Sequence, residues 1–228
     1  VSTGNAGRFY EGTTRPGSNK YSNSIVAFDI ENEKLLWEFQ EISHDIWNYD
    51  IASPPILTSI KKDDKLIDVV VVPTKFGNTL VLDRKTGNNI FEYANVKVPL
   101  SNVPGEKTSY YQKIFSLPEP FSNLFFDESH ITDLSKKSYD TVKEKIKDAS
   151  YGVFVPNSIN QKNIIYKGGA QWMGASIDND NSIMYLTSND IPFMIWLEKI
   201  DTLGYYEYSF NTEFLVDHLG YPGSKPPW

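Results

Sequence analysis

The chain has 228 residues, of which 40% are hydrophobic and 14% aromatic, enough to build a packed core and too many for a disordered chain. Acidic residues outnumber basic ones by 29 to 22, and the net charge of −7 makes nucleic acid an unexpected partner. Cysteine is absent, which excludes disulfides and thiolate metal sites within these residues. No apolar run approaches the roughly 18 residues of a membrane-spanning helix.

Two segments share one strand-turn-strand design. Residues 25–40 contain an apolar strand, a polar turn and a second strand that carries Trp37, and residues 79–93 repeat this order. Asp29 and Asp83 take the same place in the two segments, as do Trp37 and Phe91. Matching positions at a constant spacing predict a repeated β-hairpin.

A third, weaker copy spans residues 175–186, with a polar turn after Asp178. A small sheet cannot bury both of its faces alone, so repeated sheets stack around an axis with aromatic side chains between them. The predicted fold class is therefore all-β.

Residues 99–167 depart from this pattern. The stretch is rich in Pro, Ser and Asn, and residues 134–149 form its one candidate helix. The helix carries many charged residues and few apolar ones, which is typical of a solvated surface helix. We interpret residues 99–167 as an irregular, partly helical excursion from the repeated sheets rather than a separate domain.

Several motifs occur in a fixed order along the chain: Gly4-Asn5, residues 44–50 (HDIWNYD), residues 73–84, residues 168–172 (GGAQW), Ser188-Asn189-Asp190 and Gly220-Tyr221-Pro222. In this order they resemble the pyrroloquinoline-quinone (PQQ) dehydrogenases, in particular the quinoprotein glucose and quinate dehydrogenase branch of an eight-bladed β-propeller family. The resemblance implies that residues 1–228 form part of one propeller domain, about three to four blades with the excursion, and that both ends continue into a longer protein.

The resemblance implies an oxidoreductase in which PQQ takes two electrons from the hydroxyl-bearing carbon of a sugar, polyol or alcohol. A divalent cation, usually Ca²⁺ and in some relatives a lanthanide, polarises the quinone. Electrons then pass to ubiquinone or another acceptor. The same family implies a periplasmic location, with any inner-membrane anchor outside these residues.

The resemblance also implies individual roles. Asn5 matches the family's metal-binding asparagine, and Lys75 matches the cation placed against the quinone oxygens. Gln171 and Trp172 match a pair that contacts the cofactor, although asparagine is the more usual residue before this tryptophan.

Asn48 departs from the family, which places its catalytic base, an aspartate, at this position. A carboxamide cannot accept the proton, although its oxygen can still bind a metal ion. If residues 44–50 are extended, alternation puts His44, Ile46, Asn48 and Asp50 on one face. Either Asp50 or His44 then replaces the base, or the protein binds PQQ without turnover; Asp50 also matches an additional metal ligand of some relatives.

Two other classes of function remain open on the sequence. A non-enzymatic scaffold propeller would share the repeats but would not need Asn5, Lys75 or the Gln171-Trp172 pair. A sugar-binding propeller would use its aromatic side chains without a redox cofactor. NAD-dependent oxidation is disfavoured, because Gly168-Gly169-Ala170 lacks the strand-to-helix setting of a nucleotide-binding loop.

Overall fold

The computed structural model describes residues 1–200 and 208–226, and strands dominate this part of the chain. The elements in chain order are β1 (Ser24–Phe28), β2 (Leu35–Gln40), β3 (Ile56–Lys62), β4 (Lys65–Pro73), β5 (Thr79–Asp83), β6 (Tyr93–Lys97), β7 (Tyr111–Phe115), η1 (Glu128–His130), α1 (Lys136–Lys145), β8 (Ser150–Tyr151), β9 (Asn163–Asp178), β10 (Ile183–Lys199) and β11 (Tyr208–Phe214). The predicted all-β class is confirmed.

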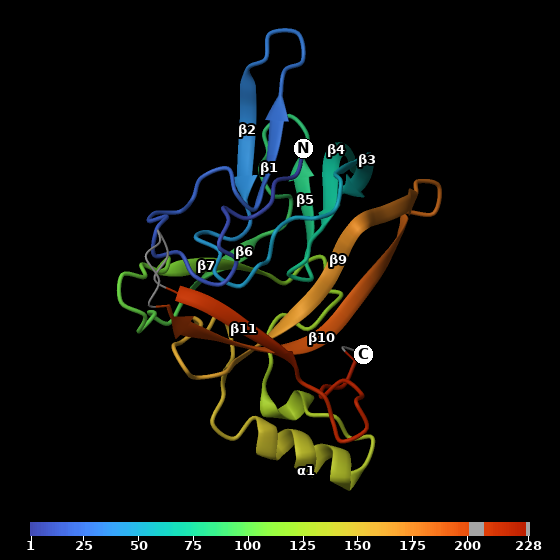
Figure 1. Ribbon diagram of the computed structural model, residues 1–228. Helices are drawn as coiled ribbons and strands as arrows, with labels where there is room; N and C mark the ends of the chain where they lie inside the picture. Colours follow the sequence, from blue (N-terminus) through green and yellow to red (C-terminus); the bar gives the residue numbers. More distant parts are fainter. Residues whose placement is uncertain (201–207, 227–228) are drawn as a thin grey trace.

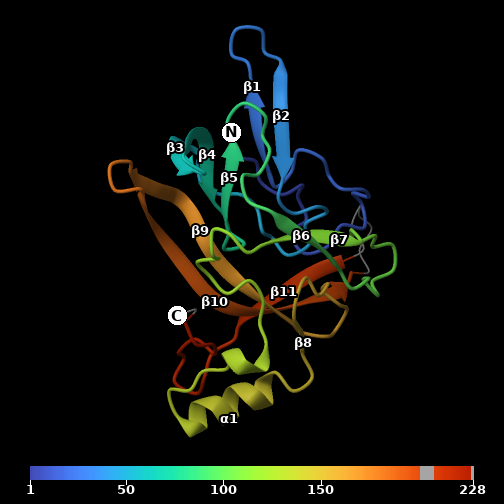
Figure 2. The ribbon, with the colours of Figure 1, turned by 180° about the vertical axis from the view of Figure 1, so that it is seen from behind.

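Within the described residues, the strands form four small sheets rather than one large sheet. They are β1-β2, β3-β4-β5, β6-β7 and the four-stranded sheet β11-β10-β9-β8, in which only β8 and β9 run parallel. The β1-β2 hairpin and helix α1 lie at opposite ends of the molecule, with the long β9-β10 hairpin between them (Figure 1). The view from behind shows the same arrangement (Figure 2).

The three predicted repeats differ in how completely they form. β1 and β2 pair as the expected antiparallel hairpin, and so do β9 and β10 on either side of the third turn. The second repeat is only half correct. After β5 the returning chain makes a single bridge, between Leu82 and Asn89, and then leaves as β6 to pair with β7. Residues 79–93 thus keep the turn and lose the second strand.

The aspartate at the start of each turn explains why the turns recur. Oδ1 of Asp29, Asp83 and Asp178 accepts a hydrogen bond from the backbone N–H two residues later, at 2.9, 2.9 and 3.1 Å respectively. A carboxylate that binds its own backbone in this way takes the place of one residue of the turn. The aspartate therefore fixes the direction in which the chain reverses.

The excursion contains the predicted helix. Helix α1 begins after Ser135, whose side chain accepts a hydrogen bond from Ser138 N–H, as an N-cap residue does. Val142 is fully buried and packs in a cluster with Phe126, Ile146 and Leu215. The helix is therefore a surface helix that one apolar side fixes to the four-stranded sheet.

An aromatic core joins the parts of the chain that surround the candidate site. Trp47 and Tyr49 pack with Phe76 and Phe154, and the ring centroids of Phe76 and Phe154 are 4.9 Å apart. The indole N–H of Trp47 donates to Val155 O at 2.8 Å. This packing holds residues 44–50 against the turn that follows β4.

Candidate metal and cofactor site

Residues 44–50 do not form the extended segment that would place alternate side chains on one face. His44 and Asn48 have positive φ values, 51° and 66°, so the chain bends at both positions. Asn is among the few residue types that adopt this left-handed conformation readily. His44, Asp45 and Trp47 are all about 1% exposed, so neighbours that alternation would separate are buried together. The prediction of one shared face was wrong because the bends rotate successive side chains.

Asp45 organises this bent segment. Its carboxylate accepts hydrogen bonds from the backbone N–H groups of Trp47 and Tyr49, each at 2.8 Å, and from Asn23 Nδ2 at 2.9 Å. Burial raises the pKa of Asp45, while these three donors act in the opposite direction. The sequence places Asp45 within the motif of residues 44–50, but it did not predict that Asp45 would hold the bend together.

His44 is enclosed by protein. Nδ1 lies 2.7 Å from Gly17 O, and Nε2 lies 2.6 Å from Glu106 Oε1. Both ring nitrogens therefore face oxygen atoms of the protein, and neither is open to a substrate. This geometry favours Asp50 over His44 as a replacement base.

Asn5 and Asn48, two of the predicted metal ligands, lie side by side. Asn5 Nδ2 donates to Asn48 Oδ1 at 3.2 Å, and Asn48 Nδ2 points to the hydroxyl of Tyr10 at 3.4 Å. The two amides are therefore close enough to share one ligand. Tyr10 was not predicted to take part.

Asp50 and Lys75 form an ion pair, with Lys75 Nζ 2.6 Å from Asp50 Oδ1. Both side chains are only slightly exposed, at 13% and 12% respectively. Gly4, which precedes Asn5, also faces Asp50: a Cβ added to Gly4 would lie 4.0 Å from Asp50 Cβ. The structure thus brings together Asn5, Asn48, Asp50 and Lys75, which we call the polar cluster.

The turn that carries Lys75, residues 74–78, is pressed against β9. Ala170 N–H donates to Thr74 O at 3.0 Å. A Cβ added to Gly169 would lie 2.3 Å from Lys75 O, so only glycine allows the two backbones to come this close. Gly169 of the Gly168-Gly169 pair therefore serves close backbone contact rather than nucleotide binding.

Gln171 and Trp172 follow directly on β9. Gln171 Nε2 donates to Gly168 O at 2.7 Å, and Gln171 O accepts from Ser53 Oγ at 2.9 Å. Trp172 is 75% exposed, so its indole presents a face that the described residues leave uncovered. The predicted cofactor-contacting pair thus lies on the stretch of β9 that also touches the turn of Lys75 and the chain just after Asp50.

The donors of the polar cluster are mostly neutral. Within residues 1–200 and 208–226 no group of three or more His, Cys, Asp or Glu side chains could hold a metal ion. A cation site here would use amide oxygens with one carboxylate, a set that suits hard cations.

Within residues 1–200 and 208–226 no helix is both long and apolar enough to cross a membrane.

Known proteins with similar sequences cover nearly all of this chain. The glycerol dehydrogenase large subunit of Gluconobacter oxydans is 30% identical over 214 residues, which is 90% of this chain and 29% of that protein. Quinoprotein glucose dehydrogenase A of Acinetobacter calcoaceticus is 28% identical over 237 residues, 92% of this chain and 29% of that protein. The chain therefore spans less than a third of the curated relatives it matches.

Solved structures show the same fold. The quinohemoprotein alcohol dehydrogenase from Comamonas testosteroni matches 99% of this chain and 29% of its own, with a TM-score of 0.56 and 20% identity. A europium-containing methanol dehydrogenase matches 100% of this chain and 36% of its own, with a TM-score of 0.57 and 19% identity. The four small sheets thus form part of a β-propeller.

The family profile described as "PQQ: Glucose/ethanol/alcohol dehydrogenase, beta-propeller domain" matches residues 1–228. The order of motifs, the strand-rich fold and this match agree. The chain belongs to the PQQ-dependent dehydrogenase β-propeller family.

Proposed function

We propose that the full-length protein is a PQQ-dependent dehydrogenase that oxidises a hydroxyl group of a sugar, polyol or alcohol. The observation that carries this proposal is the polar cluster, which joins the oxygen donors of Asn5, Asn48 and Asp50 to the ammonium group of Lys75. Relatives of this chain are named glycerol, glucose and quinate/shikimate dehydrogenases, which supports a small hydroxylated substrate.

The polar cluster fits a metal ion and an anionic cofactor. The side-chain oxygens of Asn5 and Asn48, with one carboxylate oxygen of Asp50, would hold a divalent cation such as Ca²⁺, which prefers six to eight oxygen ligands. Three ligands are too few, so the others would come from the rest of the protein, from PQQ or from water. A lanthanide is a second candidate, because Asp50 adds a carboxylate to the two amides.

PQQ, when bound, supplies a two-electron acceptor for the oxidation of a CH–OH group. Lys75 would donate hydrogen bonds to its oxygens and stabilise the negative charge that develops there. Trp172 would offer its exposed indole face to a flat ring. Gln171 would hold the backbone of β9 in place through its bond to Gly168 O.

Asp50 is the residue that would take the hydroxyl proton. Asn48 is neutral, and both ring nitrogens of His44 already face oxygen atoms of the protein. Lys75 binds Oδ1 of Asp50, so Oδ2 is the atom that would accept the proton. Lys75 would in this way hold Asp50 beside the acceptor.

A quinone is the proposed electron acceptor. The relative from Acinetobacter baylyi that is 24% identical over 245 residues is named a quinate/shikimate dehydrogenase (quinone). We also propose ubiquinone as this acceptor and the periplasm as the location of the active site, as the family resemblance implies.

The experiment is PQQ-dependent dye reduction by the full-length protein, loaded with Ca²⁺ or a lanthanide and offered glycerol, glucose, quinate or ethanol. The proposal expects turnover that requires both PQQ and the metal. Protein without added PQQ is the control. If no loaded form oxidises any hydroxylated substrate, the proposed enzyme is excluded.

Asn48 supports a second candidate, a protein that binds PQQ without turnover. Its carboxamide stands where the family resemblance expects a catalytic aspartate. PQQ binding without oxidation of any substrate, together with turnover gained by Asn48→Asp, would favour this candidate over an active enzyme.

A further inference from the structure

Glu41 is a fully buried carboxyl group that the predicted site does not include. It follows β2 directly, and its backbone N–H donates to Asn23 O at 2.9 Å. The residue is 0% exposed. Oε1 accepts two hydrogen bonds, from Thr74 Oγ1 and from Asn78 Nδ2, each at 2.9 Å.

Those two donors are the first and last residues of the turn that carries Lys75. Within the turn, Thr74 N–H donates to Asn78 O at 2.8 Å, and Asn78 N–H donates to Thr74 Oγ1 at 3.2 Å. Gly77 N–H closes the turn on Thr74 O at 3.1 Å. One oxygen of Glu41 therefore ties both ends of a five-residue turn together.

The turn is held from two sides. Glu41 binds its ends, while Ala170 N–H and Gly169 on β9 contact the backbone of Thr74 and Lys75. With its backbone fixed in this way, Lys75 extends its side chain to Asp50. The position of Lys75 Nζ thus depends on contacts that none of the predicted site residues makes.

Burying the carboxyl group of Glu41 costs desolvation free energy that a purely structural contact does not require. Its second oxygen, Oε2, has no hydrogen-bond partner among the described residues. The nearby Lys113 gives its ammonium group to Gln40 O, at 2.7 Å, instead of pairing with Glu41. A neutral acceptor could close the same turn without the desolvation cost of a carboxyl group.

Resting on the function proposed above, we propose that Glu41 is a positioning residue that holds residues 74–78 so that Lys75 Nζ stays where it meets the oxygens of PQQ. Glu41 does not touch the cofactor. Its influence on PQQ passes through Lys75, so the two residues must be coupled.

The test is a double-mutant cycle on PQQ affinity in the full-length protein, measured at equilibrium by the change in PQQ absorbance on binding. The variants are Glu41→Leu, Lys75→Met and the double variant. We expect Glu41→Leu to raise the Kd of PQQ about 10-fold when Lys75 is present, and less than about 2-fold when residue 75 is methionine. Equal fold-changes in both backgrounds would overturn the inference, because a general structural effect would be additive.

Two further variants make the result specific. Glu41→Gln keeps an accepting oxygen, so it is expected to recover most of the affinity that Glu41→Leu loses. Glu144→Leu, on exposed helix α1, is the matched control and leaves the Kd unchanged. Recovery no better with glutamine than with leucine would contradict the role of the accepting oxygen.

If Glu41→Leu does not fold, Thr74→Val carries the same cycle, since it removes one of the two donors to Glu41 Oε1. A Kd that Thr74→Val changes equally with and without Lys75 would overturn the inference. If the unaltered protein does not bind PQQ, the proposed function and the role of Glu41 are both excluded. If it binds PQQ but Glu41 and Lys75 are not coupled, only the role of Glu41 is excluded.

Discussion

Residues 41–50 and helix α1 are both rich in polar and charged side chains, but the two regions use them differently. In residues 41–50, Glu41, His44 and Asp45 are at most 1% exposed, and each binds protein groups that are distant in the sequence. In α1, Lys136 and Asp140 pair with each other at 2.8 Å while their side chains are 87% and 55% exposed. Buried polar groups fix one geometry because leaving them unpaired costs free energy, whereas exposed pairs exchange freely with water.

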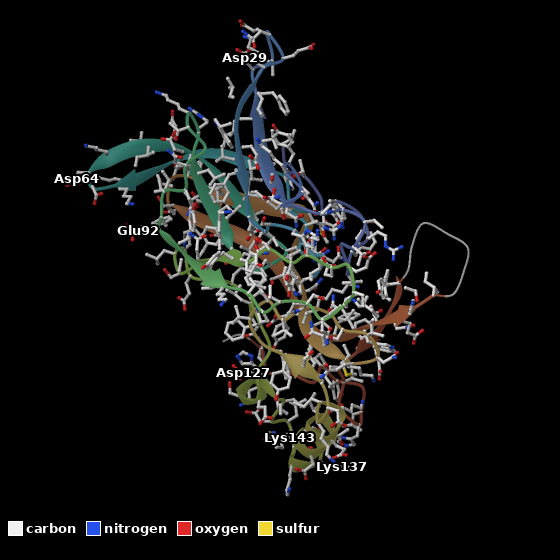
Figure 3. The ribbon with its side chains drawn as sticks, turned by 90° about the vertical axis from the view of Figure 1, so that its left-hand side faces the viewer. Asp29, Asp64, Glu92, Asp127, Lys137 and Lys143 are labelled. Carbon is white, nitrogen blue, oxygen red and sulfur yellow. The ribbon has the colours of Figure 1, made fainter. Side chains whose placement is uncertain are left out.

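The two regions also pack in different hydrophobic clusters: Val142 of α1 lies in a cluster with Phe126, Ile146 and Leu215, whereas Ile46, Trp47 and Tyr49 lie in another. Lys137 and Lys143 of α1 are at the opposite end of the molecule from Asp29 at the tip of the β1-β2 hairpin (Figure 3). Changes in α1 therefore serve as controls for changes near the site. The comparison predicts large effects in residues 41–50, Asp50 included, and small effects in α1.

The substitution Asp50→Asn is expected to have the largest effect, a loss of catalytic rate. If Asp50 takes the substrate proton, replacing its carboxylate lowers kcat by about 10²–10⁴-fold. The measurement is steady-state dye reduction by the full-length, PQQ-loaded protein. Asp64→Asn, whose carboxylate is 93% exposed, is the matched control and should keep kcat within about 2-fold. A fully active Asp50→Asn protein would remove Asp50 as the base.

The next largest effect is on stability, from Asp45→Ala. The change leaves the N–H groups of Trp47 and Tyr49 and the amide of Asn23 without their buried acceptor. We expect the free energy of unfolding to fall by about 2–4 kcal/mol. Denaturant unfolding of the full-length protein, followed by tryptophan fluorescence, measures this change. A loss below about 0.5 kcal/mol would mean that the bend at residues 44–48 does not need the carboxylate.

A smaller effect, with a defined pH dependence, is expected for Glu41→Gln. Burial raises the pKa of Glu41 from 4.5 to about 7, against the opposing effects of Asn78, Thr74 and Lys113. Between these two values the folded protein binds more protons than the unfolded chain, so the free energy of unfolding falls as the pH rises through this window. A shift of this size corresponds to at most about 3 kcal/mol.

Glutamine cannot titrate, so Glu41→Gln removes this pH-dependent contribution. The melting temperature of the variant, relative to the unaltered protein, should be higher at pH 8 than at pH 5. Thermal unfolding of both full-length proteins at the two pH values gives the comparison. A difference that does not change with pH would show that Glu41 is ionised throughout this range.

The smallest expected effect is from Lys136→Ala in α1. Its exposed pair with Asp140 spans one helical turn, and water screens such pairs strongly. The melting temperature should fall by less than about 1 °C, and by still less in high salt. A loss of several times this value would show that the contrast between the two regions is not one of burial.

Much of the fold could be predicted because its signals are local. Asp29, Asp83 and Asp178 each bind a backbone N–H two residues away, so the turns are visible in the sequence. The bends at His44 and Asn48 were not visible, because positive φ values at non-glycine residues depend on the surrounding packing. The contact of Glu41 with Thr74 joins residues 33 positions apart, and no local pattern predicts it.

The contacts around the polar cluster have a consequence for how the protein reaches its folded state. Asn5 and Asn48 are 43 positions apart, and Ser53 and Gln171 are 118 positions apart. Closing such long loops costs chain entropy before any contact repays it, so these pairings form slowly compared with a single hairpin or helix. The cluster would then be among the last parts to assemble, and recovery of ligand binding during refolding would lag behind the recovery of secondary structure.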